Sequence, residues 1–184
     1  AVNSRKVDAT LATQYSGEVK FVRALTYFSL VQIFAKPYAL DNGASPGLPL
    51  RLKGETSAAG SELKRSTVAQ IYDQILKDLN EAEEALPADY STPLLRTTRA
   101  HKNTAIALKT RVLLAKGDYA GVITEGNKIV SASAPFKSPN RVAHELQADV
   151  VSVFRTPYTS VESIFSFPMA DTNAPGTQNQ LGYY

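Results

Sequence analysis

The clearest pattern in the 184-residue chain is an apolar stripe with helical spacing over residues 68–86. The stripe follows the i, i+3, i+4, i+7 rule of a helix with one buried face. Thr67 and Gln70 have the spacing of a capping box, which satisfies free backbone N–H groups at a helix start. Pro87 cannot continue the helix. The pattern therefore predicts a helix over 68–86, whose apolar residues are Val68, Ile71, Tyr72, Ile75, Leu79, Ala82 and Leu86.

Residues 18–34 are also expected to be helical, with a different pattern. In the second half of this segment, apolar residues cover most of the helix circumference, so this half is expected to be buried on nearly all sides. Lys20 and Arg23 mark its polar edge, and Arg23 is expected to hydrogen-bond a neighbouring helix or loop carbonyls. The preceding residues 3–16 are expected to form a weak helix or an irregular lead-in.

Two further helices are predicted over residues 100–116 and 119–132. Gly117 fits the left-handed residue that ends a helix, and Asp118 can cap the start of the next one. Because the turn is so short, the two helices should lie antiparallel. This helix pair is similar to a tetratricopeptide unit, with the small residue Ala105 in its first helix and the aromatic residue Tyr119 at the start of its second. No clear second copy occurs at an offset of about 34 residues, so a regular repeat array is not supported.

Two stretches lack helical periodicity. Residues 37–64 form a long connection rich in Pro and Gly, which is either a functional loop or a simple tether. After residue 135 the pattern decays: residues 146–154 are compatible with a short helix and residues 162–169 with a short strand. The predicted fold class is therefore mainly α, with antiparallel helix pairs, tetratricopeptide-like packing, long irregular loops and little strand.

Composition excludes several kinds of functional site. The chain has no Cys, which excludes a disulfide framework, a thiol nucleophile and a Cys zinc site. Its two histidines, His101 and His144, are far apart in sequence, so a multi-His metal site is not expected, and no cofactor is expected either. Residues 1–17 lack a signal-peptide pattern, and the longest apolar stretch, residues 24–35, is too short to span a bilayer.

The net charge is +3, and the charges are unevenly distributed. Residues 78–89 hold five acidic and no basic residues, whereas residues 96–116 hold six basic and no acidic residues. A nucleic-acid surface would need aromatic residues among the basic ones, and this stretch has none. Two neighbouring helices with complementary charges are therefore the favoured interpretation, and no nucleic-acid partner is expected.

The sequence shows few of the residue patterns typical of an enzyme active site. Neither histidine lies near a motif for a serine nucleophile. The acidic residues Glu81, Glu83 and Glu84 could suggest the paired carboxylates of a glycosidase. They fall mostly away from the apolar stripe, however, and are expected to be solvated. The glycines form no phosphate-binding loop. The sequence therefore favours a non-enzymatic protein.

Five segments, in this order, resemble one protein family. They are residues 17–28 (GEVKFVRALTYF), 47–50 (GLPL), 65–75 (RSTVAQIYDQI) with Asp78-Leu79, 107–112 (ALKTRV) with Gly117-Asp118-Tyr119, and 162–166 (ESIFS). In their order and spacing they resemble the SusD/RagB family of outer-membrane nutrient-binding lipoproteins from the Bacteroidetes. The resemblance implies a helical scaffold with tetratricopeptide-like pairs that supports an irregular, ligand-binding remainder.

The resemblance also implies where the protein works and with what. Family members are secreted, lipidated at an N-terminal Cys, displayed on the outer membrane, and partnered with a TonB-dependent (SusC-like) transporter. They bind a glycan or another nutrient before import. Because they are much longer, residues 1–184 are expected to be a single incomplete domain, with a helical scaffold over 18–134 and the start of the ligand-side region over 135–184. Any membrane contact is expected only through a lipid anchor absent from this chain. The alternative is a tetratricopeptide-like protein-interaction scaffold without a small-molecule site.

Candidate ligand residues lie in two loop segments. Neutral glycans are held by aromatic faces that stack on the sugar ring and by polar side chains that bond the hydroxyls. The alternative is that Tyr38 and Tyr158 pack against the ends of helices and that the polar C-terminal segment is simply flexible. The predicted ligand-binding residues are Tyr38, Asp41, Asn42, Tyr158, Asn179, Tyr183 and Tyr184.

Overall fold

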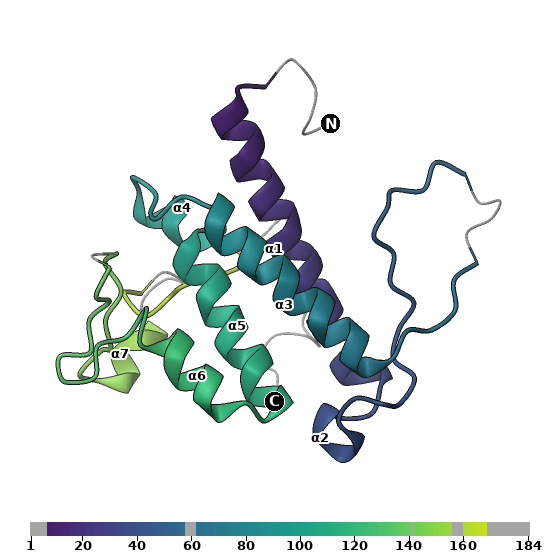
Figure 1. The fold of residues 1–184 in the computed structure, drawn as a ribbon. Coiled ribbons are helices and arrows are strands. Elements are labelled where there is room, and N and C mark those ends of the chain that lie inside the picture. Colours follow the sequence, from purple (N-terminus) through teal and green to yellow (C-terminus); the bar gives the residue numbers. More distant parts are fainter. Residues whose placement is uncertain (1–6, 58–61, 141, 156–159, 169–184) are drawn as a thin grey trace.

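The computed structural model describes residues 7–57, 62–140, 142–155 and 160–168. Figure 1 shows a helical scaffold with long irregular connections, and in the described ranges the only β pairing is two isolated bridges. The mainly helical fold class is confirmed. The helices are α1 (Ala9–Phe34), α2 (Tyr38–Asp41), α3 (Val68–Ala85), α4 (Pro93–Thr98), α5 (Lys102–Lys116), α6 (Tyr119–Gly126) and α7 (Val150–Arg155).

Four of these helices, α1, α3, α5 and α6, follow one another as neighbours in space (Figure 1). Gly17 of α1 lies against Leu86, and Phe28 packs edge-to-face on Tyr72 of α3, so α1 and α3 run antiparallel. The apolar stripe predicted for α3 faces this core. Burial of such a stripe supplies most of the stability of a helix in water. The core side chains include Phe21, Ala24, Phe28, Val31, Ile71, Tyr72, Ile75, Leu79, Ala82, Leu86, Leu108 and Val112.

An ion pair lies inside the α1–α3 contact. Arg23 donates from Nε to Asp78 Oδ2 at 2.7 Å and from Nη2 to Asp78 Oδ1 at 2.6 Å. Gln74 donates to the same carboxylate at 2.9 Å. The hydrogen bonds to Asp78 raise the pKa of Arg23. The prediction that Arg23 bonds a neighbouring helix is thus confirmed, and the two-pronged geometry fixes how α1 and α3 align.

Helix α1 differs from its prediction in two respects. The helical alternative for residues 3–16 is confirmed from Ala9 onward, but this helix is continuous with the one predicted over 18–34, and the carboxylate of Asp8 caps its first turn by accepting from the backbone N–H groups of Thr10 and Leu11. The expected burial on nearly all sides is also wrong for the described part of the chain. Only the face toward α3 and α5 is covered, and several large apolar residues on the opposite face are exposed.

The α5–α6 turn follows its prediction. Gly117 has φ +84°, and Asp118 accepts from the N–H of Gly121 at 2.9 Å. Helix α6 nevertheless ends at Gly126, six residues before the predicted end at residue 132. The N–H of Ser131 bonds the carbonyl of Lys137 instead of continuing the helix, so the irregular segment that follows takes over its hydrogen bonding.

Complementary charges do join the helices, as the charge pattern indicates. Lys109 of α5, a buried residue, contacts Glu83 of α3 and Glu125 of α6, and Lys128 pairs with both glutamates. Glu83 is therefore not solvated, contrary to expectation. Its pKa is lowered because these hydrogen bonds and charges outweigh the cost of its burial. Glu84 is exposed, as expected.

The long connection between α1 and α3 folds back on itself. Gly47 donates to Ser66 O at 2.7 Å, and Ser66 donates to Leu48 O at 2.9 Å. The predicted capping box of Thr67 and Gln70 is present. Earlier in the connection, the N–H of Ala69 reaches the carbonyl of Gly43 at 2.9 Å. The base of this connection is therefore tied to the start of α3 and is more than a tether.

Two predictions for the last part of the chain need correction. Helix α7 covers Val150–Arg155 instead of 146–154, and the carboxylate of Asp149 caps it by accepting from Val151 N. Residues 162–168, the described part of the predicted strand, contain no strand. Ser166 N instead donates to the carbonyl of Thr97, and Phe165 packs edge-to-face on Phe21 at 5.1 Å. Phe165 packs against the core, whereas Phe167 is 70% exposed, and among the described residues no strand pairs with this segment.

The buried ion pair gives a first prediction. Replacing Arg23 with Met leaves a buried carboxylate, 1% exposed, without its cation, and should lower the free energy of unfolding by about 3 kcal/mol. The matched control is Lys20→Met on the same helix. Lys20 pairs with Glu81 across the same interface, but their side chains are 31% and 37% exposed, so the loss should stay below about 1 kcal/mol. Urea unfolding of both variants measures the difference, and equal losses would contradict the role given to Asp78.

Two glycines with positive φ give a second prediction. A Cβ on Gly43 (φ +75°) would stand 2.7 Å from the backbone nitrogen of Ala69, whereas nothing lies within 4 Å of one on Gly117 (φ +84°). Gly117→Ala should therefore cost only the left-handed backbone strain, about 1 kcal/mol. Gly43→Ala adds a backbone clash and should cost about 3 kcal/mol in total. Thermal unfolding separates the two, and a Gly43 variant as stable as the Gly117 variant would show that the close approach is unimportant.

Candidate functional site

Three predicted ligand residues lie together at α2. Tyr38 opens this helix, its ring lies 5.1 Å from that of Tyr72, and the ammonium of Lys116 lies 5.3 Å from its centroid. Asn42 ends the helix with φ +55° and is exposed. The carboxylate of Asp41 accepts a hydrogen bond from the Ser45 hydroxyl, which lowers the pKa of Asp41.

These contacts give each of the three residues a structural task. Tyr38 packs on the partly exposed edge of the core, as the alternative interpretation of a helix plug expected. Asp41 and Asn42 hold the turn that leads into the long connection. A role in ligand binding stays a prediction for all three. The other predicted ligand residues, Tyr158, Asn179, Tyr183 and Tyr184, lie outside the described residues.

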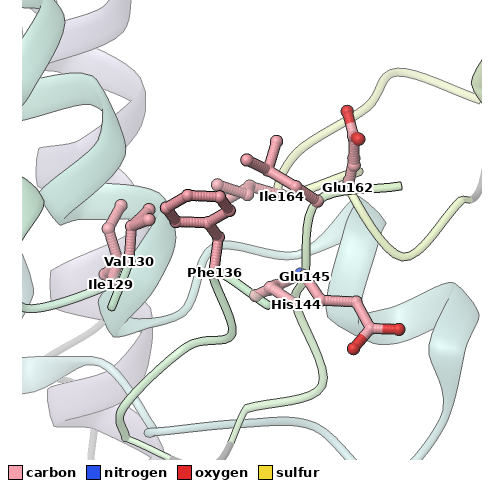
Figure 2. Close-up of a pocket in the computed structure, with 8 residues that line it drawn as sticks. Ile129, Val130, Phe136, His144, Glu145, Glu162 and Ile164 are labelled. Carbon is pink, nitrogen blue, oxygen red and sulfur yellow. The ribbon is translucent and has the colours of Figure 1, made fainter. Parts of the chain in front are cut away.

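A small hollow that sequence reasoning missed lies beyond the end of α6. It has a volume of about 120 Å³. Figure 2 shows the ring of Phe136 between Ile129 and Val130 on one side and Ile164 on the other, with the carboxylates of Glu145 and Glu162 directed away from the ring. Phe136 has φ +54°, an uncommon conformation for an aromatic residue, which often marks functional positions. The only sequence signal here was the loss of helical periodicity after residue 135.

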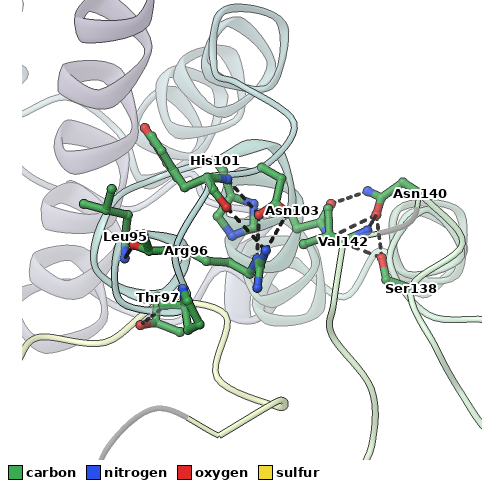
Figure 3. A network of polar contacts seen from close by, with 12 residues as sticks. Leu95, Arg96, Thr97, His101, Asn103, Ser138, Asn140 and Val142 are labelled. Carbon is green, nitrogen blue, oxygen red and sulfur yellow. Dashed lines mark hydrogen bonds and ion pairs between the residues drawn. The ribbon is translucent and has the colours of Figure 1, made fainter.

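A network of uncharged side chains attaches residues 138–140, next to this hollow, to the start of α5 (Figure 3). At the start of α5, Asn103 donates from Nδ2 to Ser138 Oγ and to Asn140 Oδ1, both at 3.3 Å. Ser138 Oγ donates to Asn140 Oδ1 at 2.6 Å, and Asn140 donates back to Asn103 Oδ1. Asn103 is fully buried. Because buried amides must be hydrogen-bonded, this network specifies how residues 138–140 sit on the scaffold.

The two histidines, although distant in sequence, stack on each other beside this network. The rings of His101, at the start of α5, and His144 lie 5.5 Å apart and 12° from parallel. Both are buried, and neither ring has a close hydrogen-bond partner among the described residues. Burial lowers the pKa of His101 to about 4, with a further contribution from His144, and burial also lowers the pKa of His144. Both imidazoles are therefore neutral at pH 7.

The histidine pair gives a prediction for pH dependence. The pKa of His101 is about 4 in the folded protein against an ordinary value of 6.5, so the unfolded chain binds more protons between these pH values. The contribution of the neutral histidines to the free energy of unfolding is therefore complete above pH 6.5, and it is lost as the pH falls toward 4. Between pH 7 and pH 5 the free energy of unfolding should fall by about 1–2 kcal/mol more in the wild type than in a His101→Gln/His144→Gln variant. Urea unfolding at both pH values checks this, and identical pH slopes would contradict it.

The described ranges also lack two kinds of feature. None of their helices is both long and apolar enough to cross a membrane. Nor do they bring three His, Asp or Glu side chains together as a metal site.

Comparison with known proteins gives consistent results. The SusD-like family model, described as starch-binding and associating with the outer membrane, matches residues 1–114. A SusD superfamily protein from Bacteroides fragilis is 37% identical, with a TM-score of 0.78, over 95% of this chain and 37% of its own. A SusD superfamily protein from Bacteroides thetaiotaomicron is 26% identical, with a TM-score of 0.67, over 79% of this chain and 28% of its own.

A third structure, of a laminarin-binding SusD-like protein, is 23% identical with a TM-score of 0.64, over 79% of this chain and 28% of its own, and shows the fold alone. Among proteins of curated function, none matches significantly. The chain thus spans 28–37% of the length of these three solved proteins. Because the family model matches more than half of the chain, from the N-terminus to within α5, the chain belongs to the SusD-like family.

Proposed function

We propose that the full-length protein binds a glycan at the bacterial cell surface and does not itself act on it. The observation that carries this proposal is the family match over residues 1–114, to a family described as starch-binding and associating with the outer membrane. The matched residues include α1, α3 and most of α5, which form the core. In this proposal the helices are the rigid support, and the irregular segments around them hold the ligand.

The proposed ligand contacts are the residues predicted from the two loop segments. In the first segment, Asn42 is exposed and offers an amide, and Asp41 beside it offers a carboxylate. In the second segment, Tyr158, Asn179, Tyr183 and Tyr184 supply three aromatic rings and an amide. Tyrosine rings stack on the apolar faces of sugars, and amides bond the hydroxyls. The laminarin-binding relative supports including β-glucans, besides starch fragments, among the first ligands to test.

We further propose that the glycan passes to a TonB-dependent, SusC-like transporter and that the protein is held at the outer membrane by a lipid on an N-terminal Cys upstream of residue 1. The family description supports the outer-membrane part. Radiolabelled fatty acid in the intact cell should enter the full-length protein, and the transporter should co-purify with it after mild detergent extraction. A soluble, unlabelled protein that purifies alone would contradict this part of the proposal.

Glycan binding is tested by titration calorimetry of the full-length protein with starch and laminarin oligosaccharides. Replacing Tyr183 or Tyr184 with Ala should weaken binding about tenfold, the effect of losing one stacking contact of about 1.4 kcal/mol. Asn42→Gly should weaken binding by a similar factor while preserving the turn, because glycine accepts a φ of +55°. Asn127→Ala, another exposed amide at the end of α6, should leave binding unchanged.

The outcome also separates the alternatives. Binding to no glycan, together with a stable complex with another protein, would favour the tetratricopeptide-like interaction scaffold. Release of reducing sugar from the bound oligosaccharide would contradict the non-enzymatic part of the proposal.

A further inference from the structure

The stacked pair of His101 and His144 joins the helical scaffold to the irregular segment after α6. His101 is the residue before the first turn of α5, and His144 lies in the described range 142–155. The two residues are 0% and 7% exposed, and none of their four ring nitrogens has a hydrogen-bond partner among the described residues. Burying an unpaired neutral imidazole costs far less free energy than burying a charged one. The contact therefore depends on both rings being uncharged.

The charged groups around the pair already have other partners. Asp89 favours the charged form of both rings, whereas Arg96 of α4 opposes it. Arg96 donates to both carboxylate oxygens of Asp89, at 2.6 and 2.8 Å, so this carboxylate is paired. On the side of the hollow, Glu145 pairs with Lys137, and Glu162 accepts from a backbone N–H. A charged imidazole would therefore have to compete for each of these three carboxylates.

A proton on either ring also meets a positive potential. The ring centroids lie 5.5 Å apart, so a charge on one ring disfavours a charge on the other. His101 stands at the N-terminal end of the 15-residue helix α5, where the helix dipole is positive. The backbone of Arg96 and of Val161 favours the charged rings, but burial opposes them more strongly. The contact is thus stable in its neutral form, and acid weakens it.

The other described contacts of this segment are few and uncharged. Asn103 exchanges hydrogen bonds with Ser138 and Asn140. Farther along, the backbone N–H of Glu145 donates to the carbonyl of Val161 at 3.3 Å. Helices α1, α3 and α5, by contrast, share the apolar core and are joined by buried ion pairs. Because regions with few apolar contacts open at a lower free energy than core helices, this segment should open before the scaffold.

The packing around His144 is also incomplete. His144 lines two hollows, one of about 120 Å³ beside Phe136 (Figure 2) and one of about 150 Å³ beside Arg96 and Thr97. Close packing holds a side chain in place, and the hollows remove part of that constraint. Phe136 has φ +54°, which is unfavourable for a bulky residue. The segment can therefore leave its place without a rearrangement of the helices, and its release relaxes Phe136.

We propose that the His101–His144 pair is a pH-sensitive switch: protonation in mildly acidic solution detaches residues 138–140 and 142–145 from the start of α5, while α1, α3 and α5 stay folded. Near pH 7 the neutral, stacked rings hold the two parts together. Once charged, the rings separate and gain contact with water, because their charge is stabilised there. The hollow beside Phe136 then opens to solvent. This change is local, and it is distinct from the loss of overall stability predicted above for acid.

The experiment is hydrogen–deuterium exchange of single amides in the full-length protein at pH 7 and pH 5, corrected for the intrinsic exchange rate at each pH. The backbone N–H of Ser138 reports on the segment, because it donates to the carbonyl of His144. The pKa of His101 is about 4 when buried and 6.5 when free, so the opening equilibrium should rise at least about 20-fold at pH 5. Local opening exposes little surface, so about 1 M urea should leave this exchange unchanged but accelerate that of α3, which needs global unfolding.

A His101→Gln/His144→Gln variant should lose this dependence on pH, because neither position can then take up a proton. Asn103→Ala is the matched control: it weakens the same attachment, so exchange should be faster at both pH values with the ratio of about 20 kept. If a variant fails to fold, the wild type alone decides.

Three outcomes would overturn the proposal. They are equal protection of Ser138 at both pH values, an acid effect confined to urea-sensitive opening, and a full acid effect in the double variant. No glycan is present in the experiment, so its result is independent of the proposed binding function.

Discussion

Arg23 crosses from α1 to α3 and gives two N–H groups to Asp78, a carboxylate that is almost fully removed from water. The geometry is directional, because the planar guanidinium matches the carboxylate only in one alignment. Apolar packing around it is strong but tolerates sliding. The ion pair therefore sets the register of α1 on α3, while α5 packs on α3 and α6 packs on α5. This arrangement leaves the opposite side of α1 exposed in the described part of the chain.

The irregular segments are attached by different forces. The helices are joined by apolar packing and ion pairs, whereas residues 138–144 are joined to the start of α5 by amides, a hydroxyl and two neutral imidazoles. Such contacts depend on complete hydrogen bonding and on the protonation state of the histidines. The scaffold and the segments around it can thus respond differently to pH.

The sequence predicted the elements whose causes are local. The start of α3, the end of α5 and the cap of α6 lie where Thr67, Gly117 and Asp118 placed them. The predicted strand near Phe165 failed, because a strand needs a partner that the sequence pattern does not show. For the candidate site, the ligand role of the residues at α2 stays a prediction, whereas the packing of Tyr38 follows the alternative of a plugged helix end. The hollow around Phe136 gave no periodic signal at all.

By itself, the sequence determined the main helices, the caps at Thr67, Gly117 and Asp118, and the family, because each depends on residues that are close in the chain or on motifs in a fixed order. Only the tertiary structure decided which charges pair, that His101 and His144 stack, and that the apolar surface of α1 is covered on one side only. The physical reason is that burial and ion pairing belong to two segments at once. An apolar residue shows that a side chain should avoid water, but only the packed neighbours show what covers it.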